Sequence, residues 1–154
     1  MSPENRLKEL KIQLPKLAEP RGNYLPWVRS GNLLFLSGAL CLTNTTMTHT
    51  GPVGETQTLE TAYQGARVCA LNLLSVIKAA IGSLDRVERI VSLTGFVNAI
   101  AGFSESPQVI NGASDFFVTI FGDKGRHARA AVAVNGLPKN STVEVQAIVE
   151  ISDA

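Results

Sequence analysis

Apolar residues recur at helical spacing in two long stretches of the chain. Between positions 58 and 81 they repeat every three or four residues, and Gly82 follows the last of them. A second such stretch begins at Ser106, which we expect to cap the helix with Pro107 in its first turn, and it ends before Gly122. This spacing predicts two amphipathic helices, and each glycine follows the last turn, as is common at helix ends.

Branched and aromatic runs between turn residues predict five strands. The run over 33–36 is apolar at every position, which is typical of a central strand. Along the third strand, Val91, Leu93 and Val97 are expected to share one face. Residues 43–57 are polar and rich in threonine and glycine, so we expect a surface loop there. The predicted strands begin at Trp27 and then cover residues 33–36, 87–97, 128–134 and 143–149.

The predicted elements follow the order ββ, α, β, α, ββ, preceded by a short helix over residues 3–13 and an irregular lead-in. We find neither a repeat nor a linker, so residues 1–154 form one predicted domain, with residues 1–22 as an N-terminal extension. Two helices of this length cover one face of a sheet and leave the other open. An open face of mixed apolar character is usually covered by another subunit. The order therefore predicts an α+β fold in a symmetric oligomer, with any pocket between subunits.

An arginine, Arg129, stands inside an otherwise apolar predicted strand. Because side chains alternate along a strand, Arg129 shares a face with Ala131 and Ala133, whose small side chains leave a hollow around the guanidinium. We expect this face to be the one without helices. Arginine is rarely buried without a partner, and its planar fork suits a carboxylate. The strand therefore indicates a site for a small molecule that carries a carboxylate.

Two other interpretations of Arg129 remain open. It can lie on an exposed strand face, or it can pair with Glu144, which lies on the less apolar face of the following strand. An arginine and a glutamate in neighbouring strands more often form a structural ion pair than a catalytic one. The spacing of the two residues does not separate these interpretations.

Composition and charge exclude several classes of function. With 154 residues, 45% apolar and 18% charged, the chain can bury a proper core. A net charge of +1 and a basic run confined to residues 124–129 do not support a nucleic-acid interface. The chain has two histidines, no clustered metal ligands and no glycine-rich phosphate loop. We therefore predict neither a metal site nor a cofactor.

The two cysteines, Cys41 and Cys69, lie in apolar surroundings. No signal peptide is recognised at the N-terminus, and no apolar run approaches the length that would span a membrane. These features predict a cytoplasmic protein with reduced thiols and no membrane contact.

Several motifs resemble one known family. The run over residues 125–132, followed by Leu137-Pro138-Lys139-Asn140 and by residues 143–145, resembles the C-terminal signature of the Rid family. These are the YjgF-type proteins, named for deamination of reactive imine and enamine intermediates. Upstream, the chain resembles the same family at Leu14-Pro15, Tyr24, Leu36-Ser37-Gly38 and Asn111, and residues 109–115 resemble a branch with longer chains.

The resemblance implies a fold and a site. The fold is similar to that of the trimeric chorismate mutases, an α+β sheet with two helices on one face, and family members form homotrimers with three clefts at subunit boundaries. Arg129 then matches the arginine that binds the substrate carboxylate, and Glu144 matches a glutamate that holds or activates water. Tyr24 and Asn111 match residues that orient the substrate, and the Gly38 backbone matches a wall of the pocket. From the residues alone, Tyr24 can equally be an interface packing residue and Asn111 an exposed helix residue.

The implied reaction is the hydrolysis of a 2-imino acid, or of an enamine such as 2-aminoacrylate, to a 2-oxo acid and ammonia without a cofactor. Two alternatives stay open: a carboxylate sensor that needs Arg129 but not Glu144, and the endoribonuclease activity attributed to relatives. The lack of a basic groove, a histidine pair and stacking aromatics weighs against the endoribonuclease. His127 is expected at the start of its strand, exposed to solvent. The chain departs from many deaminases at Ala131, where they carry a cysteine, and in a longer loop over residues 43–58.

Overall fold

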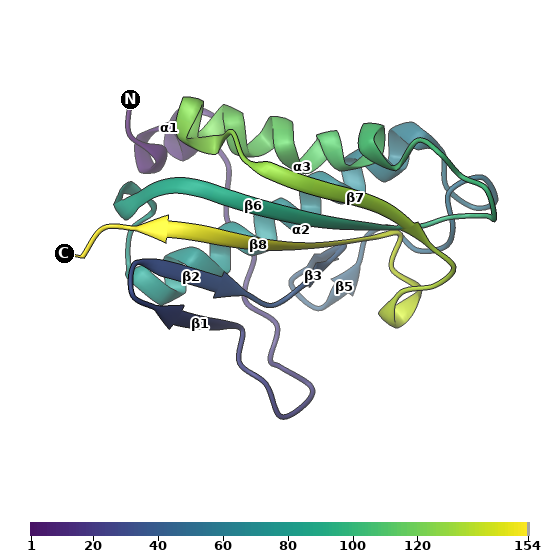
Figure 1. The fold of residues 1–154 in the computed structure, drawn as a ribbon, viewed down its shortest axis with the longest axis horizontal. Helices are drawn as coiled ribbons and strands as arrows, with labels where there is room; N and C mark the ends of the chain where they lie inside the picture. The colour runs from purple at the N-terminus through teal and green to yellow at the C-terminus, as the bar shows by residue number, and fades with distance from the viewer. Residues whose placement is uncertain (154) are drawn as a thin grey trace.

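A mixed β-sheet and a layer of helices on one of its faces form the protein (Figure 1). The structure, a computed structural model, describes residues 1–153. Its helices are α1 (Pro3–Glu9), α2 (Leu59–Ile81) and α3 (Ser106–Phe121), with short 3₁₀ turns η1 (Leu84–Arg86), η2 (Gly122–Gly125) and η3 (Pro138–Asn140). In Figure 1, α2 lies behind the sheet and α3 runs beside its upper edge.

The main sheet has the strand order β1-β2-β8-β6-β7, and β3 pairs with the part of β8 that β2 does not reach. Only β6 and β7 are parallel, and α3 forms the crossover connection that a parallel pair requires. A separate hairpin joins β4 and β5. The strands are β1 (Trp27–Ser30), β2 (Leu33–Leu36), β3 (Ala39–Leu40), β4 (Leu42–Thr43), β5 (Thr46–Met47), β6 (Val87–Asn98), β7 (Ala128–Val134) and β8 (Val143–Ile151).

The two long helices occupy the predicted stretches. Thr58 caps α2 in a reciprocal arrangement with Thr61, and Gly82 follows its last turn at φ 83°. The expectation that Ser106 caps α3 is wrong, because Glu105 takes the cap position without a side-chain bond and Ser106 is the first helical residue, buried in the fold. Pro107 lies in the first turn as predicted.

The face assignment in β6 differs from the prediction. Register shifts interrupt the β6–β8 ladder between Val87 and Arg89 and between Ile90 and Ser92. Each irregularity changes the alternation of side chains between the two faces. As a result Ile90 enters the core together with Leu93, whereas Val91 is only half-buried.

The lead-in and the predicted surface loop are more ordered than their composition suggests. The N-terminal helix ends at Glu9, and Lys11 follows with φ 54°. The stretch over 43–57 contains β5 and then turns inward, where Val53 is 2% exposed and its N–H donates to the Asn98 carbonyl at 2.8 Å. This segment therefore packs against the end of β6.

The sheet face opposite the helices carries apolar side chains. Val28, Phe35 and Val132 are exposed there by 53%, 40% and 46%, and Phe96 and Ile148 are half-buried on the same face. The strand β2 lies between β1 and β8 inside the sheet, as predicted. Only Leu34 and Leu36 of its four apolar residues enter the core. Among residues 1–153, no helix covers this face, which we call the open face.

By length and composition alone, the helix α2 is long and apolar enough to cross a membrane. The expectation that no apolar run approaches this length is therefore wrong. However, 56% of the apolar window is buried inside the fold, where residues such as Leu73 and Ile77 are fully buried. A central core helix meets the same criteria, and the burial of α2 identifies it as one.

Candidate functional site

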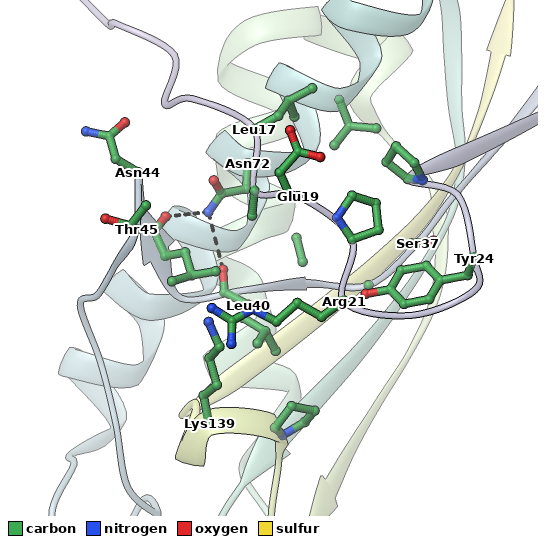
Figure 2. A pocket seen from close by; sticks show the side chains of 18 residues that line it. Leu17, Glu19, Arg21, Tyr24, Ser37, Leu40, Asn44, Thr45, Asn72 and Lys139 are labelled. Atoms are coloured by element: carbon green, nitrogen blue, oxygen red, sulfur yellow. Dashed lines mark hydrogen bonds between the residues drawn. The ribbon is translucent and has the colours of Figure 1, made fainter.

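A cavity of about 470 Å³ opens between the lead-in and the end of the sheet (Figure 2). Its walls come from residues 17–21, Tyr24 and Pro26 of the lead-in, from residues 37–40 at the β2–β3 junction, from the β4–β5 hairpin, from α2 and from Pro138 and Lys139 of η3. Tyr24 and Gly38, both predicted site residues, line it. The cavity is thus bounded mostly by loop segments that a rigid sheet and helix hold in place.

Glu144 lies directly behind the Gly38 wall. The pairing of β3 with β8 sets Leu40 opposite Glu144, and a Cβ added at Gly38 would overlap the Oε2 atom of Glu144. Only glycine leaves room for the carboxylate at this position. Gly38 therefore has a specific steric role beside a charged group.

The Glu144 carboxylate has no hydrogen bond or ion pair to any part of the chain that the structure describes. It is half-buried, and this burial raises the pKa of Glu144 above the ordinary carboxyl value. A partly desolvated carboxylate without a partner is well suited to accept a hydrogen bond or a proton from a bound molecule.

Ser37 anchors the segment that carries Tyr24. Its Oγ donates to the Leu25 carbonyl at 2.6 Å, and its N–H donates to the Pro26 carbonyl at 3.0 Å. Tyr24 is 55% exposed, and Figure 2 shows its ring along the cavity beside Ser37. At the other end of the segment, the Pro15 carbonyl accepts from Ser75 Oγ at 2.8 Å.

Arg129 lies on the helix-facing side of β7, so the expectation that it belongs to the open face is wrong. Its guanidinium donates from one Nη to Ser114 Oγ at 3.0 Å and from the other to the Pro107 carbonyl at 3.1 Å. The parallel register pairs Arg129 with Leu93, which points into the core. Alternation along one strand does not reveal which of its faces meets the helices.

A hydrogen-bonded chain holds Arg129 in this position. His127 Nδ1 lies 2.6 Å from the Gly125 carbonyl and its Nε2 lies 2.9 Å from Ser114 Oγ. The carbonyl can only accept, so Nδ1 carries the proton and Nε2 accepts from the Ser114 hydroxyl. Burial lowers the pKa of His127, and the charge of Arg129 acts in the same direction while the hydrogen bond to Gly125 opposes it, so the net lowering favours this neutral form.

The predicted solvated position of His127 is therefore wrong, and Ser114 is a functional candidate that the sequence patterns missed. The His127 ring also packs edge-on against Phe117 at a centroid distance of 6.2 Å. Ser114 follows Pro107 by seven positions on α3, so both face the same strand. The seven-residue spacing between Pro107 and Ser114 points to Ser114 as a partner of Arg129 only when Arg129 is known to face α3.

Asn111 lies on the same stripe of α3, four residues after Pro107 and three before Ser114. It is half-buried, and its side chain makes no hydrogen bond within the described chain. Arg129 and Asn111 therefore lie at one site, each with hydrogen-bonding capacity left.

The predicted site residues thus form two separate groups. Tyr24 and Gly38 line the cavity with Glu144 packed behind Gly38, whereas Arg129 and Asn111 lie at the α3–β7 edge. Within residues 1–153, Arg129 and Glu144 form no ion pair, because they project from opposite faces of the sheet. A single copy of the chain does not bring the two groups together.

Neither group resembles a metal centre, and the described chain has no cluster of three His, Cys, Asp or Glu side chains. The thiols of Cys41 and Cys69 are both fully buried and lie 3.8 Å apart. Burial raises the pKa of the Cys69 thiol well above its usual value, as expected for a packing residue.

Several known proteins are similar to this chain in fold and in sequence. A family model described as "YjgF/chorismate mutase-like, putative endoribonuclease" matches residues 4–151. Protein TCP17 of Trypanosoma cruzi is 44% identical over 148 residues, which are 96% of this chain and 92% of the relative. A 2-iminobutanoate/2-iminopropanoate deaminase of Dermatophagoides farinae is 28% identical over 141 residues, 91% of this chain and 94% of the relative. A crystal structure from Shewanella oneidensis MR-1, described as a "putative endoribonuclease", superposes with a TM-score of 0.94 at 32% identity and covers 98% of this chain and 100% of that chain.

Proposed function

Because the chain belongs to the YjgF/chorismate mutase-like family, the Rid family, we propose that it hydrolyses reactive 2-imino acids to 2-oxo acids and ammonia. Enamines such as 2-aminoacrylate enter the reaction as their imine tautomers. The observation that carries the proposal is the position of Glu144, a partly desolvated carboxylate without a partner, directly behind Gly38 in the wall of a cavity of about 470 Å³.

In this proposal the complete site forms between copies of the chain in a homotrimer. The open face, with Phe35 and Val132 exposed, supplies an apolar surface for such packing. A guanidinium has five N–H donors, and the bonds to Ser114 and Pro107 use only one on each Nη of Arg129. Its remaining donors are available to the carboxylate of a substrate held in the cavity of a neighbouring copy.

The chemistry follows from the charges of a 2-imino acid. Arg129 binds the carboxylate, while Tyr24 and Asn111 orient the molecule by hydrogen bonds. Water attacks the imine carbon while Glu144 takes a proton from the water, and Glu144 then gives this proton to the nitrogen to form a carbinolamine. Glu144 next takes the hydroxyl proton and returns it to the nitrogen as the C–N bond breaks, so that ammonia leaves and the oxygen becomes the 2-oxo group.

Release of ammonia and 2-oxo acid from freshly generated 2-iminobutanoate tests the proposal, with Glu144→Gln as the diagnostic variant and Glu150→Gln as the control. Glu150 is an exposed residue on the same strand. Binding of 2-oxobutanoate without turnover in the wild type would identify a carboxylate sensor instead. Cleavage of a single-stranded oligoribonucleotide, with no turnover of the imine, would identify an endoribonuclease.

A further inference from the structure

Two cationic side chains, Arg21 and Lys139, line the same cavity although they lie far apart in the sequence. Both are exposed, and neither has an ion-pair partner in residues 1–153. Figure 2 shows their cationic ends directed to the same end of the cavity, near Leu40. This end of the cavity therefore concentrates positive charge without an internal counter-charge.

The backbone places Lys139 there at a conformational cost. Its φ of 54° and ψ of 25° lie in the left-handed region, which suits glycine or asparagine better than lysine. Asn140, at φ 56°, donates its N–H to the Leu137 carbonyl at 3.0 Å, and its own carbonyl accepts from the Gly51 N–H at 2.8 Å. The turn is thus fixed, and it holds Lys139 in one position at the cavity.

Other charged groups near the cavity leave this end positive. Glu19 is the one carboxylate among the residues that line it, and Figure 2 shows Glu19 beside Leu17 rather than beside Leu40. Glu144 lies behind Gly38. Two like charges directed to one place repel each other, and an anion between them converts that repulsion into attraction.

We propose that Arg21 and Lys139 bind the second carboxylate of a dicarboxylic substrate, so that the preferred substrates are 2-imino dicarboxylates of four or five carbons. The inference rests on the proposed function, since it assigns the substrate class of the same cavity. The cavity of about 470 Å³ has room for the second carboxylate.

Two stable 2-oxo acids of equal chain length test the inference by calorimetry. 2-Oxoglutarate carries the second carboxylate and 2-oxopentanoate lacks it. We expect 2-oxoglutarate to bind the wild type at least about tenfold more tightly, as expected for a charge-assisted contact. Arg21→Gln and Lys139→Asn should each bring the ratio of the two affinities close to one, and asparagine is compatible with the backbone at position 139.

Lys11 provides a matched control. It has the same φ of 54°, is exposed and does not line the cavity. Lys11→Asn should leave the ratio of affinities unchanged. Equal binding of the two acids by the wild type, or an unchanged ratio in both cavity variants, would overturn the inference. Tighter binding of an oligoribonucleotide than of 2-oxoglutarate, lost in the same variants, would also overturn it.

A turnover experiment separates the inference from the proposed function. Faster hydrolysis of 2-iminoglutarate than of 2-iminobutanoate, with loss of this preference in Lys139→Asn, would support both. Hydrolysis of the two imines at equal rates would overturn the substrate class and leave the deaminase standing. No hydrolysis of either imine, with binding of 2-oxoglutarate that depends on Arg21 and Lys139, would support the anion site and refute the deaminase.

Discussion

Arg129 and Glu144 project from opposite faces of one sheet, Arg129 toward α3 and Glu144 toward the open face beside Gly38. Each is held by its own surroundings, Arg129 by Ser114 and Pro107 and Glu144 by the β3–β8 pairing. Because neither side chain reaches the other within the chain, a reaction that uses both requires at least two copies. For the proposed reaction, assembly is therefore expected to be a condition of activity.

We predict that the protein is a homotrimer at micromolar concentration. Val132→Asp places a charge on the exposed apolar face and should dissociate the assembly and abolish imine hydrolysis together. Val118→Asp is the control, since Val118 is similarly exposed, at 37%, but lies on α3. Light scattering gives the mass of each variant. A wild-type monomer with full activity would contradict both the trimer and the shared site.

Glu144→Gln should lower the rate of imine hydrolysis by about a hundredfold or more, the contribution typical of a positioned general base. The affinity for 2-oxobutanoate should change much less, because the proposed carboxylate contact belongs to Arg129. Steady-state kinetics and calorimetry on the assembled variant separate the two effects. An unchanged rate in assembled Glu144→Gln would remove Glu144 from the mechanism.

Glu144 should also make stability depend on pH. Burial raises the pKa of Glu144 in the folded state, so the folded protein binds this proton more tightly than the unfolded chain does. The associated stability is present below the carboxyl pKa of the unfolded chain and is lost as the pH rises through the folded-state pKa. We therefore expect Glu144→Gln to melt at a higher temperature than the wild type at pH 7, with a smaller difference at pH 4. A lower melting temperature at pH 7 would indicate that the carboxylate has a stabilising partner in the assembly.

Gly38→Ala should displace the Glu144 carboxylate, since the added methyl group would overlap Oε2. The expected result is a large loss of turnover in a folded protein, because the carboxylate can move while the sheet stays paired. Gly136→Ala is the matched control, as a Cβ at Gly136 meets no atom within 4 Å. Circular dichroism reports whether the variant is folded, and the rate of imine hydrolysis reports its turnover. Full activity of Gly38→Ala would show that the position of the carboxylate is unimportant.

Arg129→Lys keeps the positive charge and removes the planar fork. We expect the affinity for 2-oxobutanoate to fall by roughly tenfold or more, since lysine cannot bind a carboxylate through two parallel bonds. Arg126→Lys, at an exposed residue near Asp123, should bind as the wild type does. If Arg129→Lys bound the acid normally, recognition through the fork would be excluded.

The helix positions were predictable because spacing and end residues determine them locally, as Thr58 and Gly82 do for α2. The face of Arg129 was not, because it depends on the register between β6 and β7, and the irregularities near Ile90 add no recognisable residue pattern. The hydrogen bond between Ser114 and His127 could not be predicted either, because it depends on how α3 packs against the start of β7. The convergence of Arg21 and Lys139 depends on the path of a segment outside any helix or strand.

Within residues 1–153, hydrogen bonds tie the wall that carries Tyr24 to the rest of the fold at its two ends. Lys16 N–H donates to Asn44 Oδ1 at 3.1 Å at one end, and Ser37 holds residues 25 and 26 at the other. Residues 17–24 make no hydrogen bond to the described chain between these points. Insertions, deletions and substitutions in this span therefore alter the cavity without breaking a bond of the sheet or the helices. The selectivity of the cavity can therefore be changed by substitutions in this span while the sheet and the helices stay the same.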